Sequence, residues 1–128
     1  MINAKTFEYG CSRWEDIFNQ LRNDGFDVYS PGIKTGDCIS PYVVVAISSS
    51  MEHTSFSSNV DLYSVMCYVP KQAYSRLEPL VRSVEDSMSK LAPMILPYGQ
   101  KQPSFYDDTI KAHMISIMYK NYKKIKEE

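Results

Sequence analysis

The chain has 128 residues, a mass of 14.7 kDa, an apolar fraction of 44% and a formal net charge of -1. This length favours one domain with a single hydrophobic core, and without a basic excess we do not expect nucleic-acid or anionic-membrane binding as the main task. No run approaches the roughly 18 apolar residues of a membrane span. We therefore expect one soluble domain over residues 1–128, with 1–11 and 124–128 as terminal arms.

The first predicted element is a helix over residues 12–24. Ser12 and Glu15 have the spacing of a capping box, in which each side chain satisfies a backbone group at the helix start. Apolar residues then recur at helical spacing, and Gly25 follows the last turn, where a left-handed backbone suits glycine. These signals together predict an amphipathic helix that packs one face against the core.

Two strands and a polar loop are predicted next. Residues 26–28 indicate a short strand, and the β-branched run 42–47 is typical of a central strand covered on both faces. The serine-rich stretch 48–58 predicts an exposed hairpin loop. It presents Met51 and Phe56 on a connection too polar to be buried, so we expect both residues to belong to an assembly surface. An ordinary mobile loop is the alternative.

The second half of the chain predicts a strand over 60–69, a helix over about 76–91, a short strand over 94–96 and a long strand over 109–122. Pro79 falls near the first turn of that helix, so we expect an irregular beginning. The element order is α-β-β-β-α-β-β. Short connections favour antiparallel neighbours. The prediction is an α+β fold, with two helices packed on one face of a mixed, mostly antiparallel sheet.

The last predicted strand is longer than its short neighbour at 94–96 can pair. Part of its backbone should therefore find a partner in another subunit, or be covered by a terminus. On this basis we expect proline at Asn121 to spare the monomer and impair oligomers. Aromatic groups supply contact area at interfaces and lysines guard unpaired edges, which predicts a subunit boundary at or near Tyr119, Lys120, Tyr122 and Lys123.

Residues with catalytic or metal-binding chemistry are few and scattered. Cys11, Cys38 and Cys67 fit no zinc motif and no disulfide framework, so we interpret them as reduced thiols, with Cys67 in the core. His53 and His113 have no neighbouring cluster of metal ligands. We expect no catalytic residue, no cofactor and no metal, and hence a protein that works through its surfaces.

Several segments resemble small proteins encoded among the head-to-tail joining genes of long-tailed phages and prophages of Firmicutes. The resemblance is to the tail terminator or tail completion proteins, and it covers roughly residues 12–124. It is carried by residues 26–32 (FDVYSPG), 40–44 (SPYVV), 67–70 (CYVP), 103–108 (PSFYDD) and 111–114 (KAHM).

The resemblance implies a non-enzymatic virion subunit with a tail-terminator-like fold. Such a subunit forms a ring, typically a hexamer, on the last ring of the tail tube and docks it to the head connector. Its partners would be further copies of itself, the tail tube protein and the neck proteins. Double-stranded DNA would pass through the ring without specific binding. The protein would reside in the host cytoplasm during assembly and then in the neck of the virion.

Three alternatives to the tail terminator remain open from the sequence. Another neck component, such as a head completion or connector adaptor protein, has similar size and class. A small ligand-binding or regulatory α+β domain would need a pocket whose polar groups usually leave a motif, and none is recognised. An enzyme is the least favoured of the three.

Overall fold

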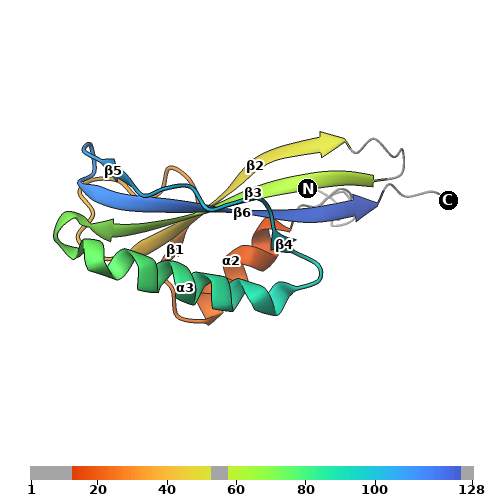
Figure 1. The fold of residues 1–128 in the computed structure, drawn as a ribbon, viewed down its shortest axis with the longest axis horizontal. Helices are drawn as coiled ribbons and strands as arrows, with labels where there is room; N and C mark the ends of the chain where they lie inside the picture. Colours follow the sequence, from red (N-terminus) through yellow and green to blue (C-terminus); the bar gives the residue numbers. More distant parts are fainter. Residues whose placement is uncertain (1–12, 53–57, 125–128) are drawn as a thin grey trace, which may run out of the picture.

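The described part of the chain, residues 13–52 and 58–124 of a computed structural model, folds into two layers, with helices on one face of a sheet (Figure 1). For residues 49–52, 58–60 and 122–124 only the backbone is described. The helical segments are α2 (Trp14–Asn23), η1 (Lys71–Arg76), α3 (Leu77–Met88) and η2 (Ser89–Leu91). The strands are β1 (Val28–Tyr29), β2 (Tyr42–Glu52), β3 (Ser58–Pro70), β4 (Leu96–Pro97), β5 (Phe105–Asp107) and β6 (Ala112–Lys124).

The sheet formed by these residues is mixed, with the order β1-β2-β3-β6-β4, and β5 also pairs with β6. Strands β1 and β2 pair in parallel, and the remaining neighbours within the described residues run antiparallel. The predicted fold class, α+β with two helices on a mostly antiparallel sheet, is confirmed. The central strand is β3, which is paired along its whole length with β6 and along most of it with β2. Residues 42–47, predicted as a central strand, lie in β2, an interior strand between β1 and β3, and residues 42–45 are buried on both faces as predicted, although the middle strand is β3.

The first helix ends as its sequence predicts. Gly25 has a φ of 96°, and the amide of Phe26 donates to the carbonyl of Leu21 at 3.1 Å, which closes the last turn. The beginning differs from the prediction, because Arg13 occupies the N-cap position without a side-chain hydrogen bond. Ser12, which the predicted capping box requires, lies outside the described residues.

The second helix has the irregular beginning that was predicted. Residues 71–76 form the 3-10 segment η1, and α3 follows from Leu77, so that Pro79 lies in the first turn of the regular helix. A proline there costs little, because the first-turn amides have no partner within the helix. The predicted end at residue 91 corresponds to the end of η2, a second 3-10 turn that continues α3.

Alternate strand residues divide between two apolar clusters. The helix-covered face of the sheet carries the larger one, which α2 and α3 complete with Ile17, Leu21, Leu77, Val81, Val84 and Met88. The opposite face carries a smaller cluster beneath the loop between β1 and β2, formed by Cys38, Tyr42, Val44 and Ala112. The helices therefore cover only one face, as expected for a two-layer sandwich.

Several predicted boundaries in the sheet differ from the structure, including the short strands predicted over 26–28 and 94–96, which are β1 (Val28–Tyr29) and β4 (Leu96–Pro97). The serine-rich stretch predicted as a loop over 48–58 is partly strand, since β2 continues to Glu52 and β3 begins at Ser58. The last strand begins at Ala112 rather than at residue 109, and β5 precedes it in a hairpin. In the turn of that hairpin the Asp107 carboxylate accepts from the amide and hydroxyl of Thr109, at 3.0 and 2.6 Å. This local bonding, typical of turns, competes with strand pairing.

Candidate assembly surface

Three strands continue beyond α2 as an arm, here defined as residues 48–52, 58–62 and 120–124 of β2, β3 and β6 (Figure 1). The start of α2 lies at the base of this arm, because the amide of Arg13 donates to the Tyr63 hydroxyl at 2.7 Å. From Ser49 outward the strands of the arm stay in register, with Glu52 opposite Asn59 and Asn59 opposite Lys123.

Along the arm, no other described strand pairs with the outer edge of β2. Strand β1 pairs only with residues 43 and 44, and the indole N–H of Trp14 donates to the next outward carbonyl, that of Val45, at 2.7 Å. Beyond it lies Ile47, 59% exposed, and then a register shift between Ile47 and Ser49. From Ile47 to Glu52 this edge has no strand partner within residues 13–52 and 58–124. Open edges of this kind are available for pairing with another chain.

The outer edge of β6 is mostly covered. Strand β5 pairs with residues 112–114, and β4 pairs as far as Lys120. Between these strands the amides of Gln102 and Tyr98 donate to the carbonyls of Ser116 and Met118, at 3.1 and 2.9 Å. No described strand pairs with the outer side of residues 121–124. The last strand thus extends past its short neighbour, but only by its final residues.

The direction of the β6 amides corrects the prediction for proline at Asn121. The carbonyls of Ser116 and Met118 face outward. Since backbone groups alternate along a strand, the amide of Asn121 faces β3. Asn121 is also buried, and it lies directly opposite Asp61, which is buried too. Proline at Asn121 would therefore damage the monomer, and the prediction that it spares the monomer is wrong.

Tyr119 is a core residue. It is 3% exposed and belongs to the cluster under the helices, and burial raises the pKa of its hydroxyl. Its ring is therefore not available for contact with another subunit, and the prediction that places it at a subunit boundary is corrected. It was assigned there as an aromatic residue near the end of the long last strand, but its side chain points into the core. Lys120 lies on the opposite face, half-buried, with Nζ 5.9 Å from the centroid of the Tyr98 ring.

Three of the other predicted interface residues lie in the arm. Met51 is a strand residue of β2, opposite Val60, rather than a loop residue. Tyr122 and Lys123 belong to β6, opposite Val60 and Asn59. Phe56 lies outside the described residues. Their assignment to an interface stays a prediction.

Exposed apolar side chains, which the sequence reasoning missed, occur in two separate groups. Three isoleucines lie on β2 and on the loop that leads into it, whereas the other group, richer in aromatic rings, flanks β4, β5 and η1. The first group is Ile33, Ile39 and Ile47, and the second is Tyr74, Met94, Tyr98 and Phe105. Apolar residues within predicted loops, such as Ile33 and Ile39, were the available signal in the sequence.

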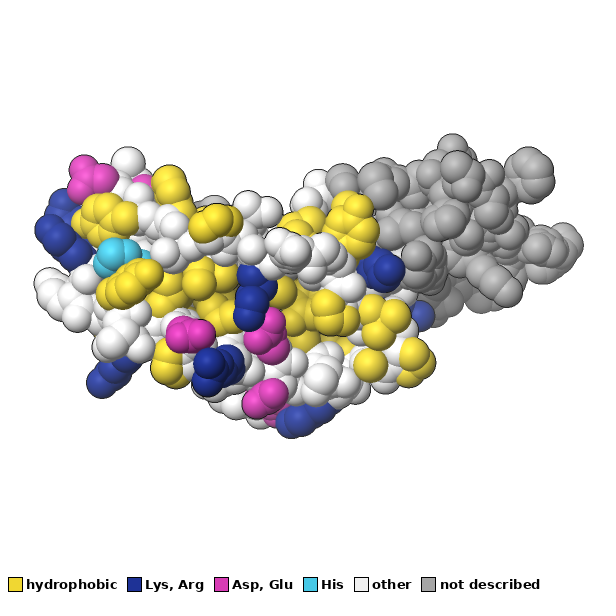
Figure 2. Space-filling model, in the orientation of Figure 1, with side chains coloured by type: hydrophobic (Ala, Val, Ile, Leu, Met, Phe, Trp, Pro, Cys, Tyr) yellow, Lys and Arg dark blue, Asp and Glu magenta, His cyan; other side chains and the backbone are white. Residues whose placement is uncertain are grey.

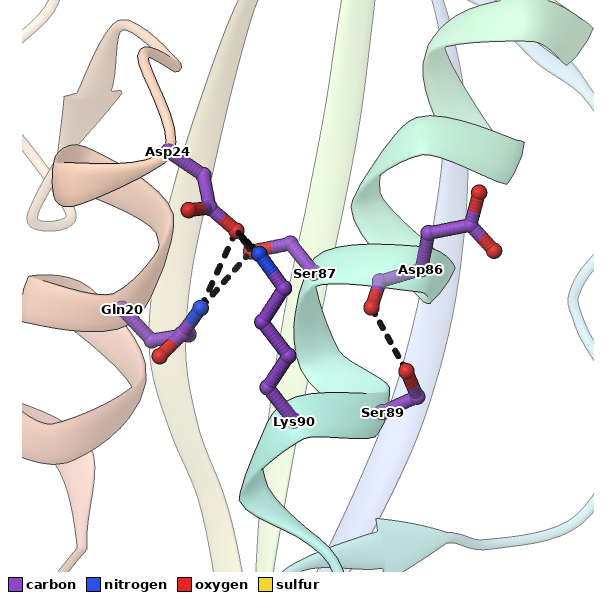
Figure 3. A network of polar contacts seen from close by, with 6 residues as sticks. All are labelled: Gln20, Asp24, Asp86, Ser87, Ser89 and Lys90. Atoms are coloured by element: carbon purple, nitrogen blue, oxygen red, sulfur yellow. Dashed lines mark hydrogen bonds and ion pairs between the residues drawn. The ribbon is translucent and has the colours of Figure 1, made fainter.

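The two helices are joined by a polar network, shown in Figure 3. Asp24, at the end of α2, accepts from the Ser87 hydroxyl at 2.6 Å, from Lys90 Nζ at 3.0 Å and from Gln20 Nε2 at 3.0 Å. These bonds lower the pKa of the Asp24 carboxyl, the largest cause being the bond from Ser87. Because every group in the network already has a partner, we interpret it as a clamp between helices.

Residues with catalytic potential are buried or isolated in the described part of the chain. Burial raises the pKa of the Cys67 thiol to about 12 and also raises that of Cys38, so neither is a ready nucleophile at neutral pH. His113 Nε2 lies 3.2 Å from the carbonyl of Lys71. Among the described residues no group of three potential ligands could hold a metal ion, and Cys11 and His53 lie outside them.

No protein-family model matches the sequence, and no curated protein matches it. No helix within residues 13–52 and 58–124 has the length and apolar character needed to cross a membrane. A functional proposal must therefore start from the sequence resemblance and from the surfaces described above.

Proposed function

We propose that the protein is a tail terminator or tail completion subunit of a tailed phage. Copies of it would form a ring that caps the tail tube and joins it to the head connector. The observation that carries this proposal is a pair of strand edges on opposite sides of the sheet that no described strand covers, with the exposed Ile47 on the β2 edge and the exposed Tyr98 next to β4 on the β6 side. The sequence resemblance over residues 12–124 supplies the specific assignment.

A ring of identical subunits needs two different, complementary patches on each chain. The β2 side offers the open edge from Ile47 to Glu52, and the β6 side offers the open edge at residues 121–124. An edge of one copy could pair with the unlike edge of the next, and such backbone pairing gives affinity without any special side-chain chemistry. The exposed ring of Tyr98, beside β4, would then face the exposed side chain of Ile47.

The proposed partners follow from the resemblance. They are other copies of the chain in a ring, a hexamer by analogy, together with the tail tube protein and the connector or neck proteins. DNA would pass through the ring, and a net charge of -1 is in keeping with passage without specific binding. A different neck component could use the same two edges, so the position of the ring on the particle distinguishes the two structural proposals.

Adjacent proline substitutions test the edge contact. The amide of Tyr122 alternates with that of Asn121 and faces outward, so Tyr122→Pro removes a donor from the open edge. Asn121→Pro removes a donor from the hydrogen bonds between β3 and β6, and it serves as the matched control that shows the effect of proline on the fold itself. We expect Tyr122→Pro to stay folded by circular dichroism and to lose rings in native mass spectrometry, whereas Asn121→Pro loses the fold.

A third variant, Tyr122→Ala, separates the effect of the side chain from that of the amide. It should form more rings than Tyr122→Pro. Rings from Tyr122→Pro at the parent's abundance would remove this edge from the proposed interface.

A further inference from the structure

A slot lies between α3 and the segment that joins β4 to β5. It has a volume of about 340 Å³ and is lined by apolar side chains of Leu77, Val81 and Ile115 and by residues 101–104. Figure 2 shows this side of the molecule as a band of apolar side chains, with charged side chains of both signs along α3 beneath it. The volume falls at the lower end of the range of small-molecule pockets.

Two contacts cross between the walls of the slot. The hydroxyls of Tyr74 and Ser104 are 3.2 Å apart, and Lys101 Nζ lies 3.2 Å from a carboxylate oxygen of Glu85. These contacts limit the length of the opening. The slot therefore suits a single inserted side chain better than a whole helix.

An exposed isoleucine on an anchored loop has the shape that such a slot would accept. Ile39 is 81% exposed, although the residue before it is fixed. The amide of Cys38 donates to the carbonyl of Ile110 at 2.8 Å, and its thiol donates to the carbonyl of Ser40 at 3.3 Å. Because Cys38 is itself buried, the loop holds Ile39 in a defined place while leaving its side chain in water.

Charge complementarity favours contact between this loop and the slot. Lys34 Nζ lies over the rings of Tyr29 and Tyr42, 5.4 and 5.5 Å from their centroids, so its charge is engaged within the loop. This leaves Asp37 as an exposed acid beside Ile39, and Arg76 is an exposed base next to the slot. Within the described residues neither has an ion-pair partner.

The loop and the slot lie on opposite faces of the sheet. Cys38 packs with Val44 and Ala112 on the face away from the helices, whereas Ile115 packs in the helix-side cluster. A contact between these two patches therefore joins unlike surfaces. Such a contact builds rings or open chains rather than two-fold dimers.

We propose that Ile39 of one copy inserts into the slot of the next copy, with Asp37 of the first beside Arg76 of the second. The inference rests on the proposed function only in requiring that copies of the chain associate. It adds a specific side-chain contact to the paired strand edges. It also predicts which side of each copy supplies the isoleucine and which side supplies the slot, and strand pairing alone does not predict this.

The test uses two variants of the full chain. Ile39→Asp removes the inserted side chain, and Gln102→Trp fills the slot from an exposed lining position. Each variant alone should need a concentration about tenfold or more above that of the parent to associate. Thr35→Asp, in the same loop, and Gln102→Ala are the matched controls and should associate as the parent does.

Mixing the two variants tests the direction of the contact. A Gln102→Trp chain keeps its isoleucine and an Ile39→Asp chain keeps its slot, so an equimolar mixture should form a one-to-one heterodimer in native mass spectrometry. Larger species should need a higher concentration than the heterodimer, because the second contact of each pair lacks the inserted isoleucine and meets a filled slot. If Gln102→Trp does not fold, Ser75→Trp blocks the slot from the other wall.

The outcomes separate this inference from the proposed function. If either variant associates as the parent does, or if the mixture stays monomeric, the contact is overturned while the ring proposal stands. A parent chain that remains monomeric, both alone and with tail tubes, overturns both.

Discussion

Ile47 is the residue at which the proposed assembly can be tested with least disturbance of the fold. It is 59% exposed, lies on the open edge of β2 and is followed by a register shift that already interrupts the ladder. Replacing it by aspartate removes an apolar contact surface and introduces a charge. Exposed substitutions usually change the free energy of unfolding by less than about 1 kcal/mol, so we expect a folded monomer.

The effect on association should be larger. Burying a whole isoleucine side chain stabilises by about 1.5–3 kcal/mol. Because 59% of Ile47 is still exposed in the monomer, about 1–2 kcal/mol remains to be gained at each subunit contact. That corresponds to about a fivefold to thirtyfold weaker contact for Ile47→Asp, before the cost of dehydrating the new carboxylate.

The assay is native mass spectrometry or analytical ultracentrifugation over a concentration series, with urea unfolding of the same samples. Ser83→Asp, an exposed position on α3, adds the same charge away from both proposed edges. We expect the control to associate as the parent does. An Ile47→Asp chain with the parent's association curve would refute the placement of this edge in the interface.

Two further predictions concern stability. Cys67→Ser should lower the free energy of unfolding by about 1–3 kcal/mol in urea, because it places a hydroxyl in a fully buried apolar site. Cys38→Ser should lower it by less than about 1 kcal/mol, since a serine hydroxyl can donate to the carbonyl that now accepts from the thiol. Equal losses of unfolding free energy in the two variants would contradict the difference between the apolar site of Cys67 and the hydrogen-bonded site of Cys38. The lowered pKa of Asp24 predicts that its contribution is present above the ordinary carboxyl value of 3.8 and is lost as the pH falls through the folded value. Asp24→Asn should flatten this acid dependence of stability, measured by thermal unfolding against pH.

The helices were the easiest part of the fold to predict. An apolar stripe at helical spacing with Gly25 after it identifies α2, and a similar stripe identifies α3 despite Pro79. In both, the pattern that buries one face is local in the sequence. The helix starts were less certain, because a capping spacing such as Ser12 to Glu15 shows only that a bond could form.

The arm was missed because its strands are imposed by tertiary pairing. Residues 48–52 are rich in serine, a weak strand former, and their own preference indicates a loop. Residues 49–52 are extended because they pair with β3, and β3 in turn is held extended by its pairing with β6. Strand propensity depends on such neighbours, which a single sequence does not reveal.

The candidate surface was predicted only in part. The length of the last strand suggested that it extends past its short neighbour, and among the described residues no strand pairs with the outer side of residues 121–124. The side on which each residue lies depends on register, however, and Tyr119 was therefore assigned to the wrong environment. The exposure of Ile39 could not be predicted because it depends on the anchoring of Cys38 to Ile110, a contact between distant parts of the chain. Loop residues carry no periodicity from which such exposure could be inferred.

Electron microscopy of the purified protein mixed with tail tubes of the same phage or prophage tests the central claim most directly. The account predicts a closed ring of this protein at one end of each tube and no binding along the tube wall. Ile47→Asp should reduce the fraction of capped ends, whereas Ser83→Asp should leave it unchanged. Tubes whose ends remain bare at saturating protein, or rings that bind only the isolated head connector, would contradict the assignment as a tail terminator.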